Sequence, residues 1–228
     1  MNDIVFSGHQ PNFFPYMGFF YKMAKSYVFV LDDDVQFSSD GFQNFNYIKV
    51  GRKKHKITVP VTFDFGQLIN EVKICYARDW EKKLLRTLEM NYSKALFFDE
   101  GMEMVAGHLG QHHETLSGLN IAVIKDLAKR FGIKTRIFIA SRDLPTKLKN
   151  NARNVWQCLQ VGADIYYSGE GGRNYNDEKM FNDHGIHILY SDYKPLVYRQ
   201  QKWNFIENLS VIDYVFNCGY NLPEVFRK

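Results

Sequence analysis

The sequence predicts an α/β fold, in which a mainly parallel sheet is flanked by helices in a Rossmann-like or nucleotidyltransferase-like arrangement, with a small β-hairpin insertion. Two observations support this prediction. Apolar and aromatic runs bounded by turn residues are typical of strands, and segments with helical spacing lie between several of them. We expect strands at residues 2–7, 27–32, 55–62, 69–75, 134–140, 164–168 and 186–191. The 228 residues contain no internal repeat or obvious linker, so a single domain over residues 1–228 is expected.

The first predicted strand leads directly into a polar loop and a helix. Residues 4–6 are apolar, His9, Gln10 and Pro11 form the turn, and Lys22 lies on the helical segment that follows. In parallel sheets, ligands bind beyond the carboxyl ends of strands, where a helix N-terminus also attracts anions. We therefore expect His9, Gln10 and Lys22 at a site for an anion such as a phosphate, with His9 as a candidate proton donor.

Three consecutive carboxylates, Asp32, Asp33 and Asp34, follow the second predicted strand. Parallel strands deliver such residues to the same edge of the sheet as His9, and neighbouring carboxylates repel one another. At least one of them is expected to need a cation, a proton or an amine nearby, and magnesium held together with a nucleotide is one candidate. The alternative is a polar loop in which one aspartate caps a turn.

The middle of the chain carries a predicted hairpin and two predicted helices. Residues 46–61 indicate a hairpin with a basic tip, which we interpret as a solvated turn because runs of charge usually face water; a phosphate-binding patch is the alternative. Helical spacing is found at residues 80–90 and 116–131. His108, His112 and His113 are interpreted as a surface cluster, since no HExxH pattern or third metal ligand accompanies them.

Two further patterns follow towards the end of the chain. A glycine-dense loop after the strand at 164–168 offers backbone N–H groups and an arginine to a phosphate, although a plain flexible turn is the alternative. Its candidate binding residues are Ser168, Gly169, Gly171, Gly172, Arg173 and Tyr175. The loop lacks the GxGxxG and GxxxxGK[ST] patterns of dinucleotide-binding and P-loop proteins. Ser210 is predicted to cap the last helix, with Asp213 as its partner in a capping box.

Composition narrows the class of protein. The net charge of +4 is too small to indicate nucleic-acid binding without a concentrated patch. The three cysteines lack CxxC spacing, so neither a disulfide framework nor a tightly bound metal is expected.

The chain shows no signal sequence or membrane span, which favours the cytoplasm. No GxSxG pattern supports a hydrolase. Aromatic residues make up 16% of the chain, which suits sugar stacking or, where they are exposed, a homodimer.

Short motifs stand in order along essentially the whole chain. They are His9 to Pro11 with Lys22, residues 31–37 ending in Asp-Val-Gln-Phe, Asn44 and Asn46, and residues 58–61, 162–175 and 210–219. Together they resemble the WbqC-like protein family, found in bacterial gene clusters for O-antigen and other surface polysaccharides. That family usually carries arginine between the two asparagines, where this chain has Phe45. Arg52 is a candidate substitute if that arginine contacts an anionic substrate.

The resemblance implies a step in surface-polysaccharide biosynthesis, where some clusters attach an amino-acid group to the amine of a sugar. We therefore predict a transferase or ligase that forms an amide, by acyl or aminoacyl transfer, on the amino group of a nucleotide-linked amino sugar, with ATP and magnesium as candidate cofactors. His9 and Lys22 would stabilise developing charge, and Asp33 or Asp34 would hold magnesium or take up the amine proton. The residues expected to bind the substrate are Gln10, Asn44, Asn46, Arg52 and the glycine-loop residues named above.

Two other classes of function fit the same residues. A non-catalytic module that binds a nucleotide-sugar would use the aromatic residues without turnover. A transferase that modifies nucleobases would use the same phosphate and aromatic features, although the modest charge disfavours it.

Overall fold

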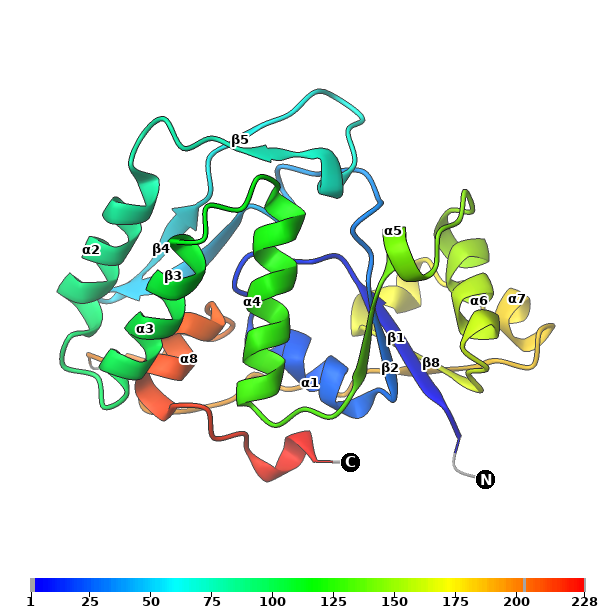
Figure 1. Ribbon diagram of the computed structural model, residues 1–228. Coiled ribbons are helices and arrows are strands. Elements are labelled where there is room, and N and C mark those ends of the chain that lie inside the picture. Colours follow the sequence, from blue (N-terminus) through cyan, green and yellow to red (C-terminus); the bar gives the residue numbers. More distant parts are fainter. Residues whose placement is uncertain (1–2, 203, 228) are drawn as a thin grey trace.

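The computed structural model describes residues 3–202 and 204–227 and contains a five-stranded parallel sheet (Figure 1). The strand order is β7-β2-β1-β8-β9, so in chain order the strands run 3-2-1-4-5, as in one half of a Rossmann-like sheet. The strands are β1 (Val5–His9), β2 (Val28–Leu31), β7 (Arg136–Ile139), β8 (Ile165–Ser168) and β9 (His187–Tyr190). The predicted α/β fold with a mainly parallel sheet is confirmed.

Two small antiparallel sheets accompany the parallel one. The predicted hairpin is formed by β3 (Phe45–Val50) and β4 (Lys53–Thr58), and a second pair joins β5 (Val61–Thr62) to β6 (Lys73–Ile74). The strand expected at 55–62 is thus divided, because Pro60 lacks the N–H that a continuous strand needs. The strand expected at 69–75 is mostly wrong, since Ile69–Glu71 form a 3-10 turn.

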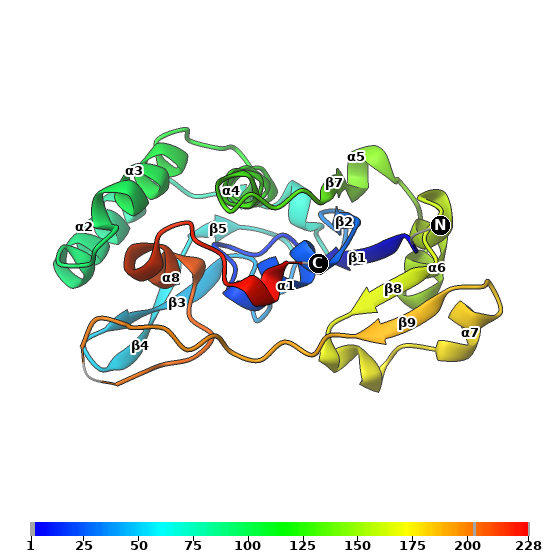
Figure 2. The same ribbon diagram turned by 90° about the horizontal axis from the view of Figure 1, so that it is seen from below.

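Helices cover both faces of the parallel sheet. Viewed from below, α1 (Met17–Lys25) and α4 (Leu116–Arg130) lie on one face, and α6 (Asn150–Gln160) and α7 (Glu178–Asn182) lie on the other (Figure 2). The short α5 (Ala140–Asp143) follows β7. Beyond α4, the helices α2 (Trp80–Tyr92), α3 (Phe98–Leu109) and α8 (Val211–Cys218) pack near the β3–β4 hairpin. No helix in the described part of the chain combines the length and hydropathy needed to cross a membrane.

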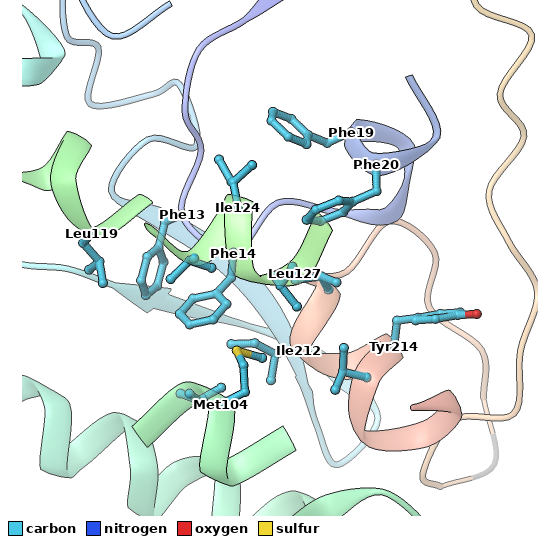
Figure 3. Close-up of a cluster of buried hydrophobic side chains, with 14 of the residues drawn as sticks. Phe13, Phe14, Phe19, Phe20, Met104, Leu119, Ile124, Leu127, Ile212 and Tyr214 are labelled. Atoms are coloured by element: carbon cyan, nitrogen blue, oxygen red, sulfur yellow. The ribbon is translucent and has the colours of Figure 1, made fainter. Parts of the chain in front are cut away.

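The alternation of side chains along the central strands separates two hydrophobic clusters. Phe29 and Leu31 of β2 face the larger cluster with α1 and α4, whereas Val28 and Val30 face the smaller one with α6. At the centre of the larger cluster, Phe13 and Phe14 are fully buried and meet edge to face with ring centroids 4.9 Å apart. Figure 3 shows these rings between side chains of α4 and the residues Met104 and Ile212.

Asp213 of α8 does not form the predicted capping box. Ser210 does act as the N-cap, because its Oγ accepts a hydrogen bond from the N–H of Ile212. The Asp213 carboxylate is instead fully buried and accepts hydrogen bonds from the hydroxyls of Tyr92, at 2.6 Å, and Tyr198, at 2.8 Å. Two tyrosine hydroxyls buried in the core need an acceptor, and this requirement outweighs the local capping pattern.

Two glycines of α3 give a matched test of this packing. A Cβ on Gly101 would lie 2.5 Å from the ring of Phe216 in α8, whereas a Cβ on exposed Gly107 would meet nothing within 4 Å. We expect Gly101→Ala to lower the free energy of unfolding by about 1–3 kcal/mol through overpacking. Gly107→Ala should raise it by up to about 1 kcal/mol, because alanine is the better helix former. Urea unfolding of both variants measures this, and equal effects would contradict the packing of α3 on α8.

Candidate functional site

The carboxyl ends of β1 and β8 mark the point where the order of the sheet reverses. From β1 the chain continues to β2 and β7 on one side, and it then returns to β8 and β9 on the other. Loops that leave such neighbouring strands diverge, so the crevice outside their carboxyl ends is where ligands bind in this class of fold. His9 is the last residue of β1 and Ser168 is the last residue of β8. The structure therefore brings the predicted opening loop and the predicted glycine loop to the same place.

His9 is neutral near pH 7 and carries its proton on Nδ1. Its Nδ1 lies 2.9 Å from the carbonyl oxygen of Gln10, which can only accept, so Nδ1 is the donor. Burial and the nearby charge of Lys22 lower the pKa of His9 to about 4, although the bond to Gln10 works in the opposite direction. The ring packs edge to face against Phe19. Nε2 consequently presents a lone pair, so His9 is suited to accept a proton rather than to donate one.

Lys22 reaches back from α1 to the end of the same strand. Its Nζ donates a hydrogen bond to the carbonyl oxygen of Gly8 at 2.8 Å, and the residue is 8% exposed. Burial lowers the pKa of Lys22 to about 8, and the charge of Asp32 partly offsets this effect. A buried ammonium beside a neutral imidazole is a fixed positive charge at the strand edge, where it attracts anions.

Arg153 supplies a cation for two of the three aspartates, Asp32 and Asp34. It donates to Asp32 at 3.1 Å and also to Asp34, and Gln157 donates to Asp32 at 2.9 Å. Burial raises the pKa of Asp32, while the bonds from Gln157 and Arg153 oppose that rise. The sequence indicated that at least one aspartate would need a cation, a proton or an amine, but it did not identify Arg153, which is 121 positions from Asp32.

Asp33 has a different role from its neighbours. Its carboxylate accepts hydrogen bonds from the backbone N–H and the hydroxyl of Ser141, at 2.9 and 2.7 Å. The residue is 3% exposed. Its two hydrogen bonds hold the first turn of α5 to the end of β2. This is the turn-capping role that the sequence left open as an alternative.

A cavity of about 460 Å³ lies beside His9. Its lining includes His9, Gln10, Asn12, Tyr16, Phe42 and Asn208. A volume of this size lies within the range of about 300–1,000 Å³ that is usual for small-molecule sites. Another cavity, of about 480 Å³, lies at the opposite edge of the sheet, where Thr135 precedes β7. The cavity beside His9, unlike the one near Thr135, combines a titratable side chain with the carboxyl end of a central strand.

The glycine loop after β8 forms an ordered 3-10 turn over Glu170–Asn174. A Cβ on Gly172 would lie 2.1 Å from Ser168 Oγ, which itself accepts a hydrogen bond from Asn176 at 3.0 Å. Around Gly169 and Gly171, by contrast, a Cβ would meet nothing within 4 Å, so this backbone is open to a ligand. Arg173 lies over the Tyr190 ring at 4.1 Å, and Tyr175 is 68% exposed.

The first turn of α1 is more covered than the sequence suggested. A Cβ on Gly18 would lie 2.3 Å from the Tyr16 ring and 2.8 Å from the Tyr193 ring. Two tyrosines therefore pack over the helix N-terminus. The glycine loop, rather than α1, provides the open backbone at this edge of the sheet.

Three predicted binding residues lie on or beside the β3–β4 hairpin, and one of them, Asn46, also lines the cavity beside His9. Asn46 uses both amide hydrogens on the carbonyls of Phe13 and Phe14, and Asn44 donates to the carbonyl of Val59. Arg52 is at the hairpin tip, about 17 Å along β3 from Phe45 at the rise of an extended strand. It is therefore not placed to substitute for an arginine at position 45.

The cation beside position 45 is Lys56, which the sequence analysis did not single out. Its Nζ lies 3.7 Å from the centroid of the Phe45 ring. The register of the hairpin sets this contact, since Phe45 pairs with Thr58 and Tyr47 with Lys56. Cross-strand neighbours of this kind become visible only once the pairing is known.

The interpretation of the three histidines as a surface cluster is wrong for His108. That residue is buried and lies 3.0 Å from Asp126, because the packing of α3 on α4 brings the two together. Among the described residues, no group of three or more histidine, cysteine, aspartate or glutamate side chains is arranged to hold a metal ion. Asp32 and Asp34 are engaged with Arg153, so these carboxylates do not form a ready cation site.

Comparison with known proteins agrees with the motifs in the chain. The model of the WbqC-like protein family matches residues 10–224. The chain belongs to this family. It is also 33% identical over 222 residues to the uncharacterized protein Rv1507c of Mycobacterium tuberculosis, with 96% of this chain and 95% of that protein covered. The WbqC-like match includes Lys22, the aspartates after β2 and the glycine loop, and it confirms the family predicted from the sequence.

Removing Arg153 should leave two buried carboxylates without their counter-charge. We expect Arg153→Met to lower the free energy of unfolding by on the order of 3 kcal/mol at pH 8. The loss should be smaller at pH 5, because without Arg153 the pKa of Asp32 rises further above its unfolded value and the folded state takes up a proton there. Urea unfolding at both pH values measures this. Arg142→Met, which removes an exposed pair with Asp143, is the control and should change little.

Lys22 and His9 should be coupled electrostatically. Because Lys22 is the second cause of the low pKa of His9, Lys22→Met should raise that pKa from about 4 without restoring its ordinary value, as burial remains. Titration of the His9 ring protons by NMR measures the shift. Lys25→Met, on the same helix, is the control. An unchanged His9 pKa in Lys22→Met would contradict the charge arrangement described above.

Proposed function

We propose that this WbqC-like protein is a transferase or ligase that forms an amide on the amino group of a nucleotide-linked amino sugar in surface-polysaccharide biosynthesis. The observation that carries the proposal is the meeting of a neutral histidine, a buried lysine and an open glycine loop where β1 and β8 end. This combination provides a proton acceptor, a positive charge and backbone donors at one ligand-binding edge.

The glycine loop and Lys22 suit the phosphates of the nucleotide. The N–H groups of Glu170 and Gly171 begin the 3-10 turn and have no acceptor within it, and the space around Gly171 is open. Lys22 adds a buried positive charge at the end of β1. Fixed donors and charges of this kind stabilise anions without reorganising on binding.

His9 is the proposed base. In amide formation, the amine nitrogen attacks an activated acyl carbon, the leaving group departs with the bonding electrons, and the nitrogen loses a proton. Nε2 of His9 holds a lone pair that accepts such a proton directly or through one water. A bound anion also offsets the charge of Lys22 and thereby raises the pKa of His9. His9 thus becomes a stronger base once the nucleotide is in place.

Lys22 and the aspartates complete the proposed roles. The ammonium of Lys22 stabilises charge that develops on an acyl or phosphate oxygen. Asp32 and Asp34 hold the side chain of Arg153, and Asp33 holds the first turn of α5. We therefore assign these carboxylates a role in stabilising the end of β2 and not in accepting the proton of the amine. ATP is a proposed activator of the acyl donor. Magnesium would then be held chiefly by its phosphates, since few free carboxylates line the edge.

Ligand-dependent stabilisation and turnover test the proposal. The purified protein is heated with nucleoside triphosphates and amino-sugar nucleotides, with and without magnesium, and amide formation is followed by mass spectrometry. A ligand at a hundred times its Kd adds about 2.7 kcal/mol to stability, which gives a clear Tm shift. We expect amide formation by the wild type and a rate lower by more than about 100-fold in His9→Ala. The control variant His55→Ala, at an exposed histidine, should change the rate little.

The outcomes separate this proposal from its alternatives. Stabilisation by an amino-sugar nucleotide without any turnover across acyl donors would favour a binding module. Salt-sensitive binding to DNA or RNA would favour the modification of nucleobases. Full activity in a correctly folded His9→Ala variant would remove His9 from the mechanism.

A further inference from the structure

We infer that the cavity beside His9 is a subsite for an uncharged sugar ring, in which Phe42 stacks on the ring and Asn12 accepts a hydrogen bond from its hydroxyl or amino group. This inference rests on the proposed function, because it assigns the sugar of the proposed nucleotide-sugar substrate to this cavity. The phosphates remain at the glycine loop and Lys22.

The lining of the cavity favours a neutral, hydrogen-bonding ligand. Among the described residues that line it, none is aspartate, glutamate, lysine or arginine, and His9 is neutral near pH 7. Most of the residues that line the cavity carry side-chain amides or are the aromatic residues Tyr16 and Phe42. Amides that present donors and acceptors, next to flat apolar rings, match the hydroxyl edges and the apolar face of a pyranose.

Asn12 carries an unused acceptor in this cavity. The residue is 6% exposed, and its Oδ1 has no hydrogen-bond partner among the residues that the structure describes. Leaving a buried amide oxygen unpaired is unfavourable, so such atoms in native structures usually bind a ligand or an ordered water. A hydroxyl or amine of a sugar ring supplies the missing donor.

Phe42 is an aromatic platform held in an unusual conformation. Its φ is +47°, in the left-handed region that bulky residues rarely adopt. The carbonyl of Phe42 accepts a hydrogen bond from Phe13 N–H at 3.0 Å, which fixes this backbone. The ring packs against Phe45 with centroids 5.1 Å apart yet remains 45% exposed. The strained backbone of Phe42 therefore leaves one face of its ring open beside the cavity. A ligand that stacks on this face would account for that arrangement.

The position of His9 connects this subsite to the chemistry. His9 lines the same cavity as Asn12 and Phe42, so a sugar bound there lies beside the proposed base. Gln10, also in the lining, has its Oε1 occupied by Gln43, and its own amide N–H groups are left to donate. The cavity therefore offers both an acceptor and donors to the hydroxyls of one ring.

Isothermal titration with UDP-glucosamine, UDP-N-acetylglucosamine and UDP alone tests the subsite, with the dTDP- and GDP-linked equivalents as further probes. We expect the wild type to bind one of these nucleotide-sugars at least about tenfold more tightly than its nucleoside diphosphate, equivalent to about 1.4 kcal/mol. Phe42→Ala and Asn12→Leu should each remove about tenfold of that preference and leave the affinity for the diphosphate unchanged. Phe42→Trp should retain it, which separates stacking from a folding defect.

The control is Phe65→Ala, at a phenylalanine that is 98% exposed and does not line the cavity. A preference for the sugar that survives in both Phe42→Ala and Asn12→Leu would overturn the subsite, as would equal affinity of the wild type for every nucleotide-sugar and its diphosphate. These titrations contain no acyl donor. They therefore measure binding apart from turnover, which the mass-spectrometry assay with acyl donors follows. Loss of sugar affinity in the variants, together with no turnover of the wild type in that assay, would support the subsite and reject the proposed reaction. Wild-type turnover that Phe42→Ala leaves unchanged would support the reaction and reject the subsite.

Discussion

The structure depends on hydrogen bonds that side chains donate to the buried loop between β1 and α1. Residues 11–15 of this loop are all buried, and buried carbonyl groups without partners are strongly unfavourable. Asn120 of α4 donates to the carbonyls of Pro11 and Gln43, and Asn46 of β3 donates to those of Phe13 and Phe14. Ser210 adds a bond to the Phe14 carbonyl at 2.9 Å. The loop is thus tied to a helix, the hairpin and the start of α8.

This arrangement determines where the functional groups lie. With the loop fixed, His9 and Gln10 emerge at the carboxyl end of β1, and Asn12 and Phe42 line the adjoining cavity. The hydrogen bonds also hold Phe14 at a φ of +39°, which turns its ring into the core. A segment that supplies both core aromatics and cavity residues links the stability of the fold to the shape of the site.

The electrostatics of the sheet edge follow from burial on its two sides. On the α6 side, Arg153 forms ion pairs with Asp32 and Asp34, so both carboxylates already have a cationic partner. On the α1 side, the charge of Lys22 is balanced only in part, by Asp32, and burial together with this charge keeps the neighbouring His9 unprotonated. An anion is therefore favoured beside Lys22, and its arrival changes the proton affinity of His9. In the proposed reaction, charge would therefore couple the binding of the anion to proton transfer at His9.

The sequence by itself determined the α/β class, the main strands, the β3–β4 hairpin and the family. Hydrophobic periodicity and turn residues are local, so they were readable along the chain. It also placed His9 and the three aspartates at one edge, because parallel strands place their carboxyl ends together, whereas the structure showed that the glycine loop lies at that edge too. The tertiary structure alone decided that Arg153 pairs with Asp32, that Asn46 serves the backbone, that Asp213 binds two tyrosines and that Asn12 and Phe42 line a cavity. These contacts join residues up to 121 positions apart, and their geometry depends on packing that no local pattern encodes.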